Sequence, residues 1–141
     1  MMKEQIVYLD KEDILIAHRT GFSQFGGTIY GFDDACVEKR VIEPQTMYWG
    51  EEQYTGVFKK AAVYLYKISI SHCFADGNKR AAFLCTDLFL RYNGYKFSAS
   101  TEELYNFCLN VANHETRPEL GEIEEWIQSN IVPYNVNEPS N

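Results

Sequence analysis

The sequence lacks several features that would place the protein in a specialised class. No apolar run approaches the ~20 residues that a helix needs to cross a bilayer, and the N-terminal Met1 to Gln5 has no apolar signal core. The four cysteines form no C-x-x-C pair, and no run of histidines completes a zinc shell. We therefore expect a cytoplasmic protein without a membrane segment, with reduced cysteines that pack as small hydrophobic side chains.

Positive charge is also scarce. The chain has 13 Lys and Arg against 20 Asp and Glu, which gives a formal net charge of -7. Proteins that bind nucleic acids need a cationic surface to displace counterions from phosphates, so direct nucleic-acid binding is not expected. The sequence also contains no G-x-x-x-x-G-K-(S/T) loop, no G-x-S-x-G elbow and no H-E-x-x-H pair. Several common enzyme classes are excluded in this way.

The composition that remains is that of an ordinary globular protein. Hydrophobic residues make up 45% of the chain, and ten Tyr and nine Phe indicate a core rich in aromatic rings. A chain of 141 residues can form one hydrophobic core without disulfides or structural metals. Because we find no repeat and no break in composition, we expect a single domain over residues 1–134, followed by a polar tail over 135–141.

Apolar periodicity predicts that most of the chain is helical. The expected helices cover residues 11 to about 25, 34 to 40, 52 to 71, 81 to 92, 101 to about 113, and a last segment after Pro118. Three of these helices have an expected N-terminal cap. The caps are Asp10 for the first helix, Asp33 or Asp34 for the second, and Ser100 with Glu103 for the helix that starts at residue 101. Residues 26–32 are expected to form an extended loop or a short hairpin, and Tyr95 to Phe97 a simple connector.

The chemistry-bearing residues gather between two of the apolar helices, in the segment His72-Cys73-Phe74-Ala75-Asp76-Gly77-Asn78-Lys79-Arg80. Residues Gly77 to Arg80 open a helix, where unpaired N–H groups and the positive end of the helix dipole form an anion site. Gly77 admits a phosphate close to the backbone, the Asn78 amide offers hydrogen bonds, and Lys79 and Arg80 add charge. This stretch is a candidate phosphate cradle.

Two further side chains in this segment carry complementary chemistry. Asp76 would repel a bare nucleotide, but magnesium typically takes one or two carboxylates together with substrate phosphates, so Asp76 is a candidate Mg²⁺ ligand. His72 is placed to accept a proton from an incoming hydroxyl. We expect Phe74 to point into the core and Cys73 to be a bystander. Each residue alone is more typical of a turn or cap, but their combination favours phosphoryl or nucleotidyl transfer.

These nine residues resemble the signature of the Fic/Doc superfamily, His-x-Phe-x-(Asp or Glu)-Gly-Asn-(Gly or Lys)-Arg. The resemblance covers about residues 5 to 130. The chain is most similar to the Doc (death-on-curing) branch, because Lys79 follows Asn78 where the Fic branch has glycine. The Fic branch also usually carries a second arginine at the position that Phe83 occupies here. The resemblance implies an all-α, compact helical bundle with a possible hairpin flap near residues 26–32.

The resemblance also implies an activity and a set of roles. His72 would be the general base, Asp76 the Mg²⁺ ligand, and Gly77, Asn78, Lys79 and Arg80 the nucleotide-binding cradle, with Arg80 also catalytic. The substrate would be Mg-ATP. We favour a protein kinase, because the Lys79 side chain fills space and can neutralise one phosphate group. A Fic-type adenylyltransferase and a catalytically silent binding module are the alternatives.

The Doc branch further implies a biological setting. Its members are toxins of toxin–antitoxin pairs, and they arrest translation by phosphorylating a threonine of elongation factor Tu. Self-restrained Fic proteins carry a (Ser or Thr)-x-x-x-Glu-(Gly or Asn) helix. The nearest match here, Ser98 to Glu102, is followed by Glu103, so we expect no inhibitory helix. The expected partners are therefore a protein target and a cognate antitoxin.

Overall fold

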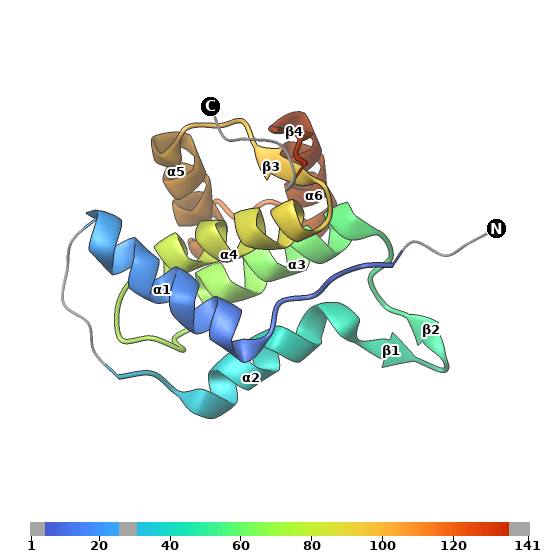
Figure 1. Cartoon of the computed structure of the whole chain (residues 1–141), viewed down its shortest axis with the longest axis horizontal. Coiled ribbons are helices and arrows are strands. Elements are labelled where there is room, and N and C mark those ends of the chain that lie inside the picture. Colours follow the sequence, from blue (N-terminus) through green and yellow to red (C-terminus); the bar gives the residue numbers. More distant parts are fainter. Residues whose placement is uncertain (1–4, 26–30, 136–141) are drawn as a thin grey trace.

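The structure, a computed structural model, describes residues 5–25 and 31–135. Within these ranges the chain is helical, with two small antiparallel strand pairs (Figure 1). The α-helices are α1 (Lys11–Phe25), α2 (Asp34–Ile42), α3 (Val57–Ile70), α4 (Asn78–Tyr92), α5 (Thr101–Ala112) and α6 (Leu120–Ser129). A 3₁₀ turn, η1 (Glu43–Gln45), follows α2, and the strands are β1 (Met47–Tyr48), β2 (Glu51–Glu52), β3 (Tyr95–Phe97) and β4 (Ile131–Pro133). The expected all-α bundle is confirmed.

Helices α3 and α4 form the centre of the bundle. They run side by side through the middle of the molecule, with α1 and α2 on one side and α5 and α6 on the other (Figure 1). Because α3 is covered on several sides, nine of its 14 residues are buried, including Ala61, Leu65 and Ile68. The nine-residue motif covers most of the short connection between α3 and α4 and the first turn of α4, so buried helices flank it on both sides.

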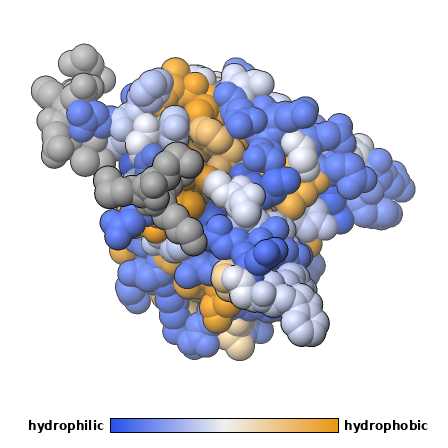
Figure 2. All heavy atoms as spheres, turned by 90° about the vertical axis from the view of Figure 1, so that its right-hand side faces the viewer, coloured by the Kyte–Doolittle hydropathy of each residue, from blue (hydrophilic) through white to orange (hydrophobic). Residues whose placement is uncertain are grey.

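The core is rich in aromatic contacts, as the composition predicts. Phe89 of α4 packs against Tyr64 of α3, with ring centroids 4.9 Å apart. Trp126 of α6 stacks on Phe107 of α5 at 3.9 Å and 4° between ring planes. The first contact joins the two central helices and the second joins α5 to α6, while polar groups make up much of the surface. Figure 2 shows one such face, where hydrophobic residues appear only in short strips between hydrophilic ones.

The predicted helix starts agree with the structure at three positions. Asp10 and Asp13 exchange backbone-to-carboxylate hydrogen bonds at the start of α1. Asp33, one of the two expected caps, accepts from Cys36 N at the start of α2. Ser100 accepts from Glu103 N at the start of α5. One predicted start is wrong: α3 begins at Val57 and not at Glu52, because residues 51–52 pair in a hairpin and Gly56 adopts φ 84°.

The two strand pairs were not predicted. Met47–Tyr48 pairs with Glu51–Glu52 through a turn in which Trp49 and Gly50 have φ of 52° and 81°. Tyr95–Phe97, expected to be a connector, pairs with Ile131–Pro133, where the fold was expected to end. Strands of two or three residues are too short to show a period-two pattern. The hairpin expected near residues 26–32 falls mostly on 26–30, which lie outside the described residues.

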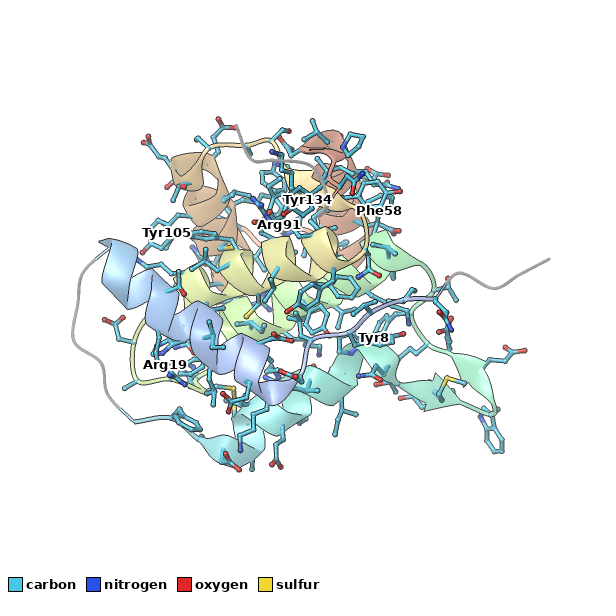
Figure 3. All side chains as sticks on the ribbon, viewed as in Figure 1. Tyr8, Arg19, Phe58, Arg91, Tyr105 and Tyr134 are labelled. Atoms are coloured by element: carbon cyan, nitrogen blue, oxygen red, sulfur yellow. A yellow bond between two sulfur atoms is a disulfide. The ribbon has the colours of Figure 1, made fainter. Side chains whose placement is uncertain are left out.

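A buried lysine joins the hairpin to the bundle. Lys60 of α3 is fully buried, and its ammonium donates to the main-chain oxygen of Pro44 at 3.1 Å. It also lies 3.3 Å from a carboxylate oxygen of Glu52 and 5.3 Å from the ring centroid of Tyr8, which is labelled in Figure 3. One charge thus contacts the N-terminal segment, the 3₁₀ turn and strand β2. Among the described residues no helix is long and apolar enough to cross a membrane.

Candidate active site

The motif loop is closed by the side chain of Asn78, the first residue of α4. Its Oδ1 accepts from Phe74 N at 3.1 Å and from Ser71 Oγ at 3.4 Å, and its Nδ2 donates to Phe74 O at 2.8 Å. Ser71 also caps the end of α3 by donating to Ile68 O. The sequence predicts that the Asn78 amide offers hydrogen bonds to a phosphate. The structure shows this amide bound to Phe74 and Ser71, so it holds the motif loop to the start of α4.

Gly77 forms the corner at which the chain turns into α4. Its φ of 83° lies in the left-handed region, which a residue with a Cβ adopts only at a cost. This corner lets Asn78 and Lys79 begin the helix with N–H groups that have no acceptor within it. The positive end of the α4 dipole points the same way, so the backbone itself favours an anion here.

Phe74 holds the loop to the body of the protein. It is 3% exposed, and it stacks on the imidazole of His18 with centroids 3.7 Å apart and planes 7° apart. His18 Nε2 lies 2.8 Å from the main-chain oxygen of Asp76, so His18 supports two residues of the loop from α1. Burial lowers the pKa of His18, which favours the neutral ring that donates from Nε2. The inward position predicted for Phe74 is confirmed; the role of His18 was missed.

A polar pocket of about 230 Å³ opens above the loop. It is lined by the side of the motif that faces solvent, namely His72, Ala75, Asp76, Gly77, Asn78, Lys79 and Arg80, together with Tyr105 of α5. His72 and Asp76 are exposed, whereas Lys79 and Arg80 are half-buried at the start of α4. The guanidinium carbon of Arg80 lies 5.7 Å from the Tyr105 ring, which projects from α5 where α4 begins (Figure 3). The structure thus brings every predicted site residue to one pocket.

The pocket fits a magnesium ion only together with a ligand that brings its own oxygens. No group of three or more His, Cys, Asp or Glu side chains in the described part of the chain forms a metal site. Asp76 is the single carboxylate that lines the pocket, and one of its oxygens accepts from Gly77 N at 2.8 Å. One carboxylate beside a phosphate cradle is the donor set that Mg²⁺ bound to a nucleotide requires.

A second, apolar pocket of about 260 Å³ adjoins the polar one. The two share Arg80 and Tyr105, and the apolar pocket is completed by Phe83 of α4 with Thr101 and Glu102 of α5. Phe83 is 3% exposed. Where the Fic signature has a second arginine, this chain therefore presents a buried phenyl ring, and the surroundings of Arg80 become apolar on that side.

The expectation that all four cysteines are reduced is wrong for two of them. Cys73, beside His72, forms a disulfide with Cys36 of α2, and their Cα atoms are 5.2 Å apart. Asp33 N donates to Cys73 O at 2.8 Å, and Phe32 forms an isolated antiparallel bridge with Phe74. Cys73 therefore links α2 to the motif loop, and because its sulfur is in a disulfide it is no thiolate nucleophile in this structure. The spacing of the two cysteines gave no signal, because residues 37 positions apart meet only through the fold.

Comparison with known proteins agrees with this geometry. A sequence model of the Fic/DOC family matches residues 8–90, which include the motif, helices α1 to α3 and most of α4. The protein "Toxin Doc" of Mycolicibacterium smegmatis is 36% identical over 92 residues, which are 65% of this chain and 68% of that protein. "Protein kinase doc" of Escherichia phage P1 is 30% identical over 95 residues, 67% of this chain and 75% of that protein. The chain belongs to the Fic/DOC family, and within it to the Doc branch.

Proposed function

We propose that the protein is the toxin of a toxin–antitoxin pair, and that it transfers the γ-phosphoryl group of Mg-ATP to a Ser or Thr hydroxyl of a translation protein, with elongation factor Tu as the candidate target. The observation that carries the proposal is that His72, Asp76, Lys79 and Arg80 line one polar pocket together. The names of the two relatives, a toxin and a protein kinase, support it.

The reaction needs a base, an anion cradle and an aligned hydroxyl. His72 takes the proton of the target hydroxyl, whose oxygen then attacks the γ-phosphorus. The bond from that phosphorus to the β–γ bridging oxygen breaks, and ADP leaves with the electron pair. Lys79, Arg80 and the first N–H groups of α4 stabilise the charge on the phosphates. Asp76 would hold Mg²⁺, which supplies further charge neutralisation on the phosphate oxygens.

The nucleoside would lie in the adjoining apolar pocket, because that pocket shares Arg80 and Tyr105 with the phosphate site. Phe83 and Tyr105 offer rings against which a purine can pack. The Lys79 side chain occupies the start of the cradle, where a glycine would leave more room for the inner phosphates. This difference is the reason that we prefer γ-phosphoryl transfer to AMP transfer.

Labelling with two forms of ATP tests the proposal. The purified protein is incubated with purified elongation factor Tu and ATP labelled at either the γ or the α position. We expect the γ-label on the target and no α-label, and we expect both to be absent with His72→Ala. Retention of the α-label would establish the adenylyltransferase alternative instead.

The binding-module alternative has its own test. Mg-ATP should raise the melting temperature of the wild-type protein and not that of Asp76→Ala or Arg80→Ala, because the shift reports binding to the folded state. Asn106→Ala, at an exposed position of α5 that lines neither pocket, is a control that should keep the wild-type shift. Partner binding without any shift by Mg-ATP would favour the module.

The proposed setting is tested by growth. Expression of the wild-type chain alone should arrest growth, and His72→Ala should relieve the arrest. The sequence has no match to the self-inhibitory helix pattern, so inhibition would come from a separate protein. Co-expression of a cognate antitoxin should therefore also relieve the arrest. Equal growth of cells that express wild type and His72→Ala, at matched protein levels, would contradict the toxin proposal.

A further inference from the structure

The disulfide between Cys36 and Cys73 is the covalent link between α2 and the motif loop. The two residues are 37 positions apart, and the bond closes a loop that contains α2, the β1–β2 hairpin and α3. The other two cysteines, Cys85 and Cys108, are free and fully buried. Burial raises the pKa of both thiols, that of Cys108 to about 12, so neither is a reactive thiolate near neutral pH.

The supports of the loop are unequal on the two sides of Cys73. On the C-terminal side, Phe74 is held by the His18 stack and by two hydrogen bonds to Asn78. On the N-terminal side, His72 is exposed, and its side chain has no hydrogen bond to any part of the chain that the structure describes. The supports nearest to it in the described part of the chain belong to its neighbours, because Ser71 donates to Ile68 O and Cys73 O accepts from Asp33 N. A change at Cys73 therefore reaches His72 directly and the phosphate cradle only weakly.

We propose that Cys36 and Cys73 form a reversible thiol–disulfide site that controls the seating of His72, with low-molecular-weight thiols and disulfides as its reactants. The oxidised form holds His72 in the position for proton transfer, and the reduced form releases it. The part of this inference that concerns catalysis rests on the proposed function; the redox site and its effect on the loop do not.

The exchange is expected to begin at Cys36, because its side chain is half-buried whereas Cys73 is 2% exposed. A thiolate attacks Cys36 Sγ, the S–S bond breaks, and the electron pair passes to Cys73 Sγ, which takes a proton. A second thiol then resolves the mixed disulfide, giving one small-molecule disulfide and two cysteine thiols. Re-oxidation by a small-molecule disulfide such as oxidised glutathione is the same sequence in reverse.

Thiol counting tests the site itself. After treatment with oxidised glutathione and denaturation without reductant, the protein should show the thiols of Cys85 and Cys108 only. After dithiothreitol it should show all four, and peptide mapping of the oxidised form should find the link between residues 36 and 73. Four thiols in the oxidised sample would overturn the proposal.

Melting and amide exchange test the effect on the loop. The oxidised form should melt about 10 °C above the reduced form, because the cross-link restricts the unfolded chain. Cys36→Ser should melt like the reduced form in both buffers, and Cys85→Ala should keep the wild-type difference. Below both melting temperatures, the amides of residues 72 and 73 should exchange faster in the reduced form. Equal exchange in the two forms would overturn the control of His72.

Kinetics separate positioning from general stability. Reduction should lower kcat for target labelling about ten-fold, because small displacements of a base are costly. The affinity for Mg-ATP should change less than about two-fold, because the cradle is held by Asn78 and α4. A parallel loss of nucleotide affinity would contradict the specific effect on His72. If neither form labels any target, the proposed function fails, while the thiol counts and amide exchange still decide the redox site.

Discussion

The imidazole of His18 and the ring of Phe74 lie almost parallel at 3.7 Å, although 56 positions separate them in the sequence. The same imidazole donates to the main-chain oxygen of Asp76. The loop that carries the site residues is therefore supported from α1 by one neutral side chain. The stability of this arrangement depends on the protonation of that side chain.

We expect the protein to lose stability as the pH falls below about 6.5, the ordinary pKa of histidine. Burial lowers the pKa of His18 in the folded state, so between that lower pKa and 6.5 the unfolded chain binds more protons than the folded one. The stabilising contribution is complete above this window and decreases as the pH falls through it. Melting temperatures measured from about pH 8 to about pH 5 check the prediction.

The variants that isolate this effect are His18→Gln and His114→Gln. The first removes the buried titrating group, so its melting temperature should depend less on pH than that of the wild type. The second removes an exposed histidine on the connection between α5 and α6 and should leave the pH dependence unchanged. An identical pH profile for wild type and His18→Gln would contradict the assignment.

Removal of the Asn78 amide should loosen the motif loop. Asn78→Ala loses the hydrogen bonds to Phe74 and Ser71, and we expect the free energy of unfolding to fall by about 2 kcal/mol. Asn78→Asp keeps the acceptor for Phe74 N and should lose about half as much. Urea unfolding measures both. Asn106→Ala, at an exposed position of α5, is the matched control and should be neutral; equal stability of Asn78→Ala and Asn106→Ala would refute the clamp.

The buried ammonium of Lys60 should matter more than that of its neighbour Lys59. Lys60→Met keeps the apolar stem but leaves Pro44 O without its donor, which should cost about 1–2 kcal/mol, and Lys60→Ala about 3 kcal/mol with the added cavity. Lys59 lies 3.2 Å from Glu124 near the surface, so Lys59→Met should cost less than about 0.5 kcal/mol. Denaturant midpoints compare the stability of the three variants. If Lys59→Met lowered the stability and Lys60→Met did not, the structural role assigned to the Lys60 ammonium would be contradicted.

The choice between kinase and adenylyltransferase makes Lys79 the informative position. Under the kinase proposal, Lys79→Ala and Lys79→Gly should both lower γ-label transfer about ten-fold or more, because one phosphate loses its neutralising charge. Only Lys79→Gly makes room for the inner phosphates, so it alone should gain any α-label. Unchanged γ-label in Lys79→Ala would show that the lysine does not act on the transferred phosphate.

The sequence predicted the site better than it predicted what supports the site. The motif residues are consecutive, so local chemistry was enough to group His72 with Asp76 and the start of α4. The caps at Asp10 and Ser100 were predicted for the same reason, because a cap depends on residues three positions apart. Each of these features lies within a short window of the chain.

The features that were missed depend on pairs that only the fold brings together. His18 reaches Asp76, Lys60 reaches Pro44, and Cys36 reaches Cys73 across 16 to 58 positions. Polar residues inside an apolar helix stripe, as His18 and Lys60 are, were the available signal, because a buried polar group needs a partner. That signal indicates that a partner exists and not which residue it is.

The turn between β1 and β2 has a practical consequence for spectroscopy. The side chain of Trp49 is fully exposed there, whereas Trp126, the other tryptophan in the sequence, packs on Phe107 in the bundle. The two indoles therefore emit from water and from a partly apolar environment, and an external quencher reaches the first far more readily. Substituting either one with phenylalanine would give a single-tryptophan protein, whose fluorescence reports on the hairpin alone or on the core alone.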